Sequence, residues 1–293
     1  MADERGTGEP GTGQPGTGEP GTSQPDPAAP PDVDVDARRA NVARVYDYWL
    51  GGTHNFQADQ DLGRQIMAVE PTVRAIARAN RAFLGRAVRM LAEAGIRQFL
   101  DIGSGIPTQG NVHEVAQAID PAARVVYADI DPVVVAYSRA IVSRNPNAAA
   151  IQADLRDPAA ILAHDTTRRL MDFSQPAGLL LVAVLHFIAD ADDPWGLAAT
   201  LRDALAPGSY LVLGQGTNAD KPVTATAFEK VYNTSSATAI QMRSRAEIAR
   251  FFGDFDLVDP GLVYVSQWRP DSPGDVPANP SVHANLVGVA RKP

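Results

Sequence analysis

The hydrophobic and polar positions from residue 98 onward follow two alternating patterns. Short runs rich in apolar and β-branched residues alternate with longer stretches in which apolar residues recur at helical spacing. This alternation predicts parallel strands joined by crossover helices on both faces of one sheet. The predicted strands are 98–102, 124–128, 149–153, 179–185 and 210–213, and the helices between them lie near 112–119, 133–144, 158–170 and 195–205.

Two helical regions precede this pattern. Apolar residues from Val42 to Trp49 recur at helical spacing and stop at Gly51, a residue typical of a helix end. A second helical region runs from about residue 66 to Gly95. We interpret residues 34–96 as a helical cover, or lid, over the ligand-binding edge of the sheet.

The remaining chain divides into an α/β domain and a tail. Residues 97–293 form the predicted domain, with a helical insertion at about 217–253 and closing strands at 257–265 and 285–291. The first residues repeat a Gly-Thr-x-x-Pro unit and contain almost no apolar side chains that could offset chain entropy. We therefore expect residues 1–33 to be a disordered tail, which serves as a linker or as an interaction tether.

Composition narrows the class of protein. The 293 residues are 45% hydrophobic and 20% charged, which is enough to bury one main core. The chain has no cysteine, which excludes disulfides, thiolate metal sites and a cysteine nucleophile and is typical of a reducing cytosol. No export signal and no apolar run of the roughly 20 residues that span a bilayer occurs, so we expect a cytoplasmic protein without membrane association. A net charge of −8 disfavours nucleic acid as a partner and favours a small molecule or a protein.

A glycine-containing turn follows the first predicted strand. Asp101 lies at the end of this strand, and Gly103, Ser104 and Gly105 lie in the turn. Glycines allow a ligand to approach the backbone closely, because a Cβ atom at either position would obstruct it. Asp101 could bind an ammonium group of the ligand, either directly or through water.

The next two predicted strands also end in carboxylates. Asp129 has the separation from the glycine turn expected of an acid that binds ribose hydroxyls, and Ile130 could pack on an adenine face. Asp131 is better interpreted as a helix N-cap with Pro132 at the first helical position. Asp154 could accept a hydrogen bond from the adenine amino group. A single strand-end aspartate can equally cap a helix or form a turn, but three at successive strands predict a ligand with a nucleoside.

These motifs resemble those of the class I S-adenosylmethionine-dependent methyltransferases. The matching segments are 101–105, 129–132, 154–155, 184–188 and 205–208, and the resemblance covers about residues 98–214. Segments 46–56 and 101–108 further resemble a bacterial S-adenosyl methyltransferase family once catalogued as a domain of unknown function. This narrower resemblance extends from about residue 39 to the C-terminus.

The resemblance implies a fold and a cofactor. The fold is α/β and Rossmann-like, with helices on both faces of a seven-stranded, mostly parallel sheet whose last strand is antiparallel. S-adenosyl-L-methionine would lie across the carboxyl ends of the first strands and leave as S-adenosyl-L-homocysteine, and Leu155 would belong to its binding site. Pro107 stands where many class I enzymes have a third glycine, so the turn must end differently. The same departure weakens a match to the dinucleotide fingerprint.

Two regions supply candidate residues around the reacting groups. His186 follows a predicted strand and could take a proton from a hydroxyl or amine, or could bind only the neighbouring backbone. Tyr46 and Asn55 belong to the predicted lid, although the same segment also fits an ordinary amphipathic helix. The predicted cofactor-binding set is Tyr46, Asn55, Asp101, Gly103, Ser104, Gly105, Asp129, Ile130, Asp154 and Leu155.

Other classes of site find no support in the sequence. The five histidines show no metal-ligand spacing, and neither a phosphate-binding P-loop nor a hydrolase nucleophile elbow occurs. A row of arginines between residues 74 and 89 is better interpreted as a solvated helix face than as an anion site. We therefore predict methyl transfer from S-adenosylmethionine to an oxygen, nitrogen or carbon of a small molecule. The alternatives are a nicotinamide-dependent oxidoreductase and a cofactor-binding regulatory protein without turnover.

Overall fold

A computed structural model describes residues 36–107, 110–236 and 238–293. The predicted tail, residues 1–33, lies outside these residues, as does Thr108 at the end of the glycine turn. The helices are α1 (Val42–Leu50), α2 (Gln57–Val69), α3 (Val73–Glu93), α4 (Val112–Ile119), α5 (Pro132–Val142), α6 (Pro158–Ala163), α7 (Asp165–Leu170), α8 (Pro194–Asp203), α9 (Pro222–Ser235) and α10 (Arg245–Ala249). The strands are β1 (Gln98–Ile102), β2 (Arg124–Asp129), β3 (Ala148–Gln152), β4 (Gly178–Val182), β5 (Tyr210–Gly216), β6 (Asp256–Leu257), β7 (Val263–Tyr264) and β8 (Asn285–Arg291).

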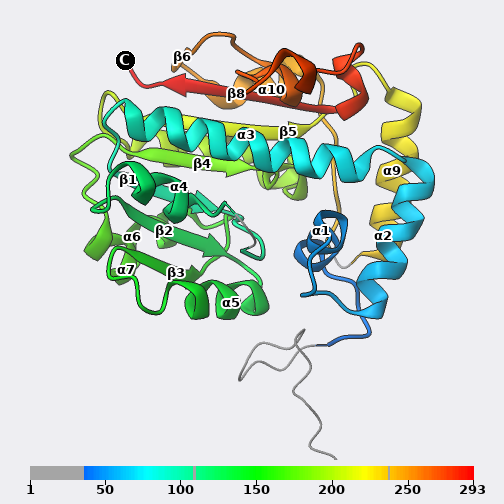
Figure 1. The fold of residues 1–293 in the computed structure, drawn as a ribbon, viewed down its shortest axis with the longest axis horizontal. Coiled ribbons are helices and arrows are strands. Elements are labelled where there is room, and N and C mark those ends of the chain that lie inside the picture. The colour runs from blue at the N-terminus through cyan, green and yellow to red at the C-terminus, as the bar shows by residue number, and fades with distance from the viewer. Residues whose placement is uncertain (1–35, 108–109, 237) are drawn as a thin grey trace, which may run out of the picture.

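The strands form a single mixed sheet (Figure 1). Its order is β3-β2-β1-β4-β5-β8-β6, and β7 also pairs with β8. The first five strands are parallel, whereas β8 runs antiparallel to β5. Ile102 pairs with Ala128, and Asp129 pairs with Gln152, so β1, β2 and β3 end at the same edge of the sheet. The predicted α/β architecture is confirmed.

Alternate residues of the strands build two core layers. Leu100, Leu179 and Leu211 point to the face covered by α6, α7, α8 and α10, and all three side chains are buried. Their neighbours, such as Phe99 and Leu180, point to the face covered by α3 and α4. Strands buried on both faces read as continuous apolar runs, which is why the pattern predicted this sheet correctly.

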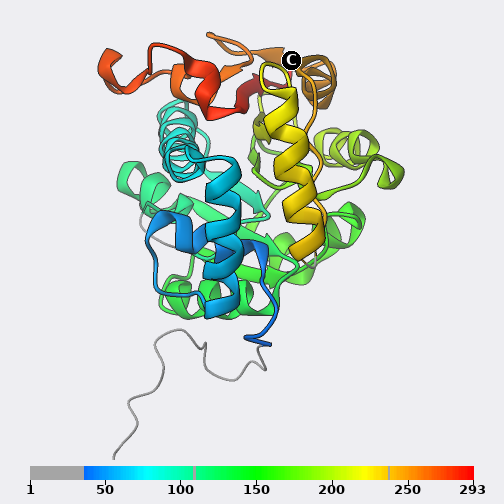
Figure 2. The ribbon, with the colours of Figure 1, turned by 90° about the vertical axis from the view of Figure 1, so that its right-hand side faces the viewer.

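Three helices lie beyond the carboxyl ends of the strands. Figure 2 shows α2 and α9 side by side at this end, with α1 beside them. They share a small apolar core that includes Val45, Trp49, Ile66, Phe228 and Tyr232. By contrast, α3 packs along the sheet (Figure 1), so only its beginning contributes to this cover.

Two predicted helices are divided in the structure. The region from residue 66 to 95 contains the end of α2 and all of α3, because Glu70 precedes Pro71 and adopts a non-helical conformation with φ −125° and ψ 87°. The predicted helix 158–170 breaks at His164, whose ψ of 134° ends α6, while its side chain caps α7. The helix end at Gly51 is confirmed, since this residue has a left-handed φ of 83°.

Three predicted strands differ in their bounds from the strands of the structure. The strand predicted to reach residue 185 ends at Val182, because Ala183 has a φ of 61° and residues Leu185–Phe187 form a 3₁₀ turn. β5 continues to Gly216, beyond the predicted end at residue 213. The run 257–265 is interrupted at Pro260 and Gly261, so β6 and β7 are separate, and the described part of the chain forms a sheet of eight strands rather than seven.

Candidate functional site

A cavity of about 360 Å³ lies at the carboxyl edge of the sheet, under the helices α1 and α9. This volume falls in the range of small-molecule sites. Of the residues predicted from the sequence, those that line it are Tyr46, Asp101, Gly103, Ser104, Gly105, Asp129, Ile130, Asp154, Leu155 and His186. Asn55 does not line it.

The two glycines of the turn are required for different reasons. Gly103 has a φ of 71°, and a Cβ atom there would lie 2.3 Å from Cγ2 of Val184. Gly105 has a φ of 65°, and a Cβ atom there would meet nothing within 4 Å. The obstruction expected at Gly103 therefore comes from the protein itself, whereas Gly105 borders open space. Between them, the buried hydroxyl of Ser104 has no hydrogen-bond partner among the described residues.

The carboxylate of Asp129 ties the glycine turn to the end of β2. It accepts hydrogen bonds from the backbone N–H groups of Gly105 and Asp131, each at 3.0 Å. Burial raises the pKa of Asp129 to about 6, against the lowering effect of these hydrogen bonds. Asp131 accepts from the Val133 N–H at 2.7 Å, and this confirms its prediction as the N-cap of α5.

Asp101 is the most deeply buried acid of the site. Its side chain is 4% exposed, and burial raises its pKa to about 7. Arg81 opposes this rise and Asp129 adds to it. A carboxylate in such surroundings would be stabilised by a cation placed in the adjoining cavity.

The third carboxylate, Asp154, is partly exposed and pairs with an arginine. Asp154 is 35% exposed at its side chain and forms an ion pair with Arg156 at 2.7 Å. Burial acts to raise the pKa of Asp154, but the hydrogen bonds from Arg156 outweigh it and lower the pKa overall. Leu155 turns its side chain into the core, whereas Ile130 is 53% exposed on the cavity wall.

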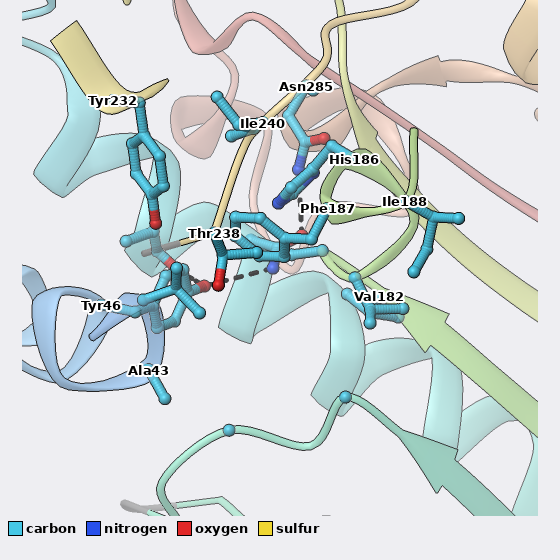
Figure 3. Close-up of a pocket in the computed structure, with 18 of the residues that line it drawn as sticks. Ala43, Tyr46, Val182, His186, Phe187, Ile188, Tyr232, Thr238, Ile240 and Asn285 are labelled. Carbon is cyan, nitrogen blue, oxygen red and sulfur yellow. Dashed lines mark hydrogen bonds between the residues drawn. The ribbon is translucent and has the colours of Figure 1, made fainter. Parts of the chain in front are cut away.

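His186 lies beyond the end of β4, in the 3₁₀ turn formed by Leu185–Phe187 (Figure 3). Burial, with a smaller contribution from Arg243, lowers its pKa to about 3. Its Nδ1 atom is buried and has no hydrogen-bond partner within the described chain. The imidazole is therefore neutral at pH 7 and free to form a hydrogen bond, but it is a weak base.

The two predicted residues of the N-terminal segment have separate surroundings. Tyr46 lines the cavity, donates its hydroxyl to the Ala77 carbonyl at 3.1 Å, and accepts from Nδ2 of Asn80 at 3.1 Å. Asn55 donates instead to Oδ2 of Asp47 at 2.8 Å and to the Gly52 carbonyl at 2.9 Å. The contacts of Asn55 therefore stabilise the turn after α1.

Several lining residues were not predicted from the sequence. They come from segments far apart in the chain and are Glu70, Asn80, Phe187, Lys221, Phe228, Tyr232, Met242 and Asn285. The helical periodicity of α9 could have indicated an apolar face at Phe228 and Tyr232. Asn80 and Asn285 carry no local signal, because their hydrogen bond joins residues 205 positions apart.

Two negative observations apply to the described residues. No group of three or more histidine, aspartate or glutamate side chains among them is arranged to hold a metal ion. None of the described helices combines the length and the apolar character that crossing a membrane requires.

Comparisons with known proteins agree with this geometry. The chain superposes on a candidate methyltransferase from Thermobifida fusca YX with a TM-score of 0.82 and 43% identity, over 88% of this chain and 96% of that chain. It superposes on a DUF574 family protein from Streptomyces avermitilis MA-4680 with a TM-score of 0.85 and 39% identity, over 89% and 100% of the two chains. No curated protein matches the chain. A family model described as S-adenosyl methyltransferase matches residues 28–293, so the chain belongs to the S-adenosyl methyltransferase family and is an S-adenosylmethionine-dependent methyltransferase.

Proposed function

We propose that the cavity holds S-adenosylmethionine against Asp101, the glycine turn, Asp129 and Asp154, and transfers its methyl group to a small molecule. The observation that carries this proposal is the convergence of three strand-end carboxylates on one cavity. S-adenosylmethionine supplies a methyl group on a sulfonium leaving group. The protein's part is then to bind, to align the acceptor and to exclude water.

Asp129 is the proposed ribose ligand. Each carboxylate oxygen already accepts one backbone hydrogen bond, which fixes its orientation and leaves further lone pairs for two ribose hydroxyls. Next to it, Ile130 presents an apolar side chain that is 53% exposed, an arrangement suited to covering a flat base.

Asp101 is the proposed ligand for the ammonium group. Its carboxyl has a pKa of about 7 because it is buried, so a cation alongside it would stabilise the ionised form and lower the pKa. Binding of an ammonium-bearing ligand should then release protons near pH 7.

Asp154 is the proposed ligand for the adenine amino group, with a condition that the sequence did not indicate. Nε and Nη2 of the Arg156 guanidinium already contact its carboxylate. One oxygen must be shared between Arg156 and the ligand. Replacing Arg156 should therefore change cofactor affinity, although it lies outside the predicted set.

The cover formed by α1, α2 and α9 is the proposed lid. Asn41, immediately before α1, donates a hydrogen bond to Asp131, the N-cap of α5, which links the cover to the α/β domain beside the predicted ribose site. Tyr46 faces the cavity from the same helix. We keep Asn55 in this proposal only as a residue that shapes the turn after α1.

His186 is the proposed hydrogen-bond partner of the methyl acceptor. A pKa of about 3 makes it a poor recipient of a whole proton at pH 7, but in the tautomer that carries its proton on Nδ1 this unpaired atom can donate a hydrogen bond to the acceptor's oxygen or nitrogen. We further propose a cytoplasmic protein, on the ground that the chain contains no cysteine.

Calorimetric titration tests the cofactor site. Wild-type protein should bind S-adenosylhomocysteine and not NAD. Asp129→Ala should weaken S-adenosylhomocysteine binding about 100-fold, since two hydrogen bonds to a carboxylate contribute about 3 kcal/mol together. Asp157→Ala, which changes an aspartate that caps α6, is the matched control and should leave affinity unchanged. Equal affinities of the wild-type and Asp129→Ala proteins would refute the proposed site.

A further inference from the structure

The cavity extends past the acidic residues into a space lined by aromatic and apolar side chains. We call this space the aromatic chamber and define it by Tyr46, Phe187, Phe228, Tyr232, Ile240 and Met242, all of which line the cavity. Figure 3 shows Tyr46 and Tyr232 on one side, with His186 and Asn285 next to each other across from them. The walls come from α1, α9 and the turn after β4, so the chamber lies between the sheet edge and the cover.

Three rings of the chamber pack against one another along the cavity wall. Phe228 and Tyr232 stack with centroids 5.8 Å apart and an interplanar angle of 19°, and Phe187 lies 5.9 Å from Tyr232 at 36°. A planar ring can form offset contacts with such rings over its whole area. A saturated, puckered ring of the same size would lose much of this contact.

A fixed hydrogen-bond acceptor lies on the wall. The Tyr46 hydroxyl donates to the Ala77 carbonyl, so its oxygen accepts from Nδ2 of Asn80. Oδ1 of Asn80 must then accept from Nδ2 of Asn285, at 3.0 Å. Because a backbone carbonyl can only accept, this chain fixes both amide orientations and leaves Oδ1 of Asn285 as an acceptor.

Two buried polar atoms therefore remain unpaired at this wall. Oδ1 of Asn285 and Nδ1 of His186 both have no hydrogen-bond partner within the described residues, and Asn285 is 5% exposed. An unpaired buried acceptor costs about 1–3 kcal/mol, which a donor on a bound molecule would recover.

The charges near this chamber are already paired. Lys221 lies 3.3 Å from Glu70 at the cavity wall. Arg243, behind His186, donates to the carbonyls of Leu185 and Ile188 and to Asp190. An ionised molecule in the chamber would therefore lose its hydration without gaining a dedicated counter-charge.

We infer that the methyl acceptor is a neutral, planar aromatic molecule whose hydroxyl donates a hydrogen bond to Oδ1 of Asn285 in the aromatic chamber. The inference rests on the proposed function, since it assigns the acceptor end of the same cavity. It names a class of molecule, the phenols, by the three features that the walls recognise: flat apolar surface, one donor, and no charge.

Binding of four probes to protein saturated with S-adenosylhomocysteine tests this inference at pH 7. The probes are 2-naphthol, its methyl ether 2-methoxynaphthalene, the carboxylate 2-naphthoate, and the non-planar decahydro-2-naphthol. We expect 2-naphthol to bind about 10-fold tighter than each of the other three. The loss of one hydrogen bond, or a loss of ring contact of similar free energy, produces a ratio of about this size. A higher affinity for 2-naphthoate than for 2-naphthol would overturn the inference. Equal affinities for 2-naphthol and its ether would also overturn it.

A variant locates the effect at Asn285. Asn285→Leu keeps the branching and the number of side-chain heavy atoms but has no acceptor, so the preference for 2-naphthol over its ether should disappear. The matched control is Asn147→Leu at the opposite edge of the sheet, where the amide binds the Pro121 carbonyl, and this variant should keep the preference. If Asn285→Leu does not fold, the affinities of the wild-type protein for the four probes still test the inference.

The two proposals fail in different ways. Absence of S-adenosylhomocysteine binding to the wild-type protein would overturn the proposed function. Normal S-adenosylhomocysteine binding without any preference for 2-naphthol would overturn only the assignment of the acceptor. Retention of the preference in Asn285→Leu would show that a different group recognises the hydroxyl, and would also overturn the inference.

Discussion

Replacing Gly103 by alanine should destabilise the fold through a contact that a conformational argument alone does not predict. Gly103 has a φ of 71°, and its missing Cβ would lie 2.3 Å from Cγ2 and 2.5 Å from Cβ of Val184. Val184 belongs to the turn after β4, next to Ala183 with its positive φ, so it cannot move away freely. The turn after β1 and the turn after β4, which both border the cavity, therefore fit together only if position 103 is glycine.

The expected loss of folding free energy in Gly103→Ala has two parts. An alanine in the left-handed region costs about 1 kcal/mol. Crowding a packed contact adds about 1–3 kcal/mol. Gly103→Ala should thus lower the free energy of unfolding by about 2–4 kcal/mol. Gly110→Ala is the matched control, because Gly110 has the same φ of 71° and a Cβ there would meet nothing within 4 Å. It should cost about 1 kcal/mol.

Urea denaturation followed by circular dichroism measures these differences. The double variant Gly103→Ala/Val184→Gly separates the two parts, since the alanine at 103 should cost only about 1 kcal/mol relative to Val184→Gly once both Cβ and Cγ2 of residue 184 are gone. Equal costs for Gly103→Ala and Gly110→Ala, or no coupling between positions 103 and 184, would refute the reasoning.

Three further predictions concern buried ionisable side chains. Burial raises the pKa of Asp101 to about 7, so the folded state binds more protons than the unfolded state between about pH 4 and 7, and its contribution to stability is lost as pH rises through 7. Asp101→Asn should flatten this fall in urea midpoints measured from pH 4.5 to 8, and an unchanged slope would contradict it. Burial lowers the pKa of His186 to about 3, so His186→Gln should leave the shape of the pH–rate profile between pH 5 and 8 unchanged; loss of an acidic limb in the variant would show a proton acceptor with a near-neutral pKa. Arg243→Met should lower the free energy of unfolding by about 3 kcal/mol, because it removes the hydrogen bond to the Ile188 carbonyl, one of the two to the Leu185 carbonyl, and the ion pair with Asp190, whereas the exposed Arg245→Met should cost under about 1 kcal/mol; similar values would show that the buried guanidinium contributes little.

The sequence predicted the sheet and the acidic edge of the cavity because both depend on short-range patterns. Strands buried on both faces give continuous apolar runs, and parallel strands place their carboxyl ends at one edge. Asp101, Asp129 and Asp154 each follow such a run directly, so their convergence on one cavity required only the correct order of strands. The N-cap role of Asp131 could likewise be predicted, since a cap involves residues two positions apart.

Two polar side chains have partners that the sequence patterns did not predict. Asn55 belongs to a segment that resembles a known family, but resemblance does not distinguish a residue that binds Asp47 from one that binds a ligand. Asp154 could be placed at a strand end, but its ion pair with Arg156 could not be inferred from that position.

The local order of residues thus determined which strands form, where their acidic ends meet, and hence the kind of cofactor. Tertiary structure alone decided the aromatic chamber, where α9 lies against α2 and Asn285 of the last strand binds Asn80 of α3 across 205 positions. It also decided that His186 is neutral, because that state follows from burial and from the proximity of Arg243 rather than from any neighbour in the sequence. The physical reason is the same in each case: hydrogen-bond direction and desolvation depend on which atoms lie within a few ångströms, whatever their separation along the chain.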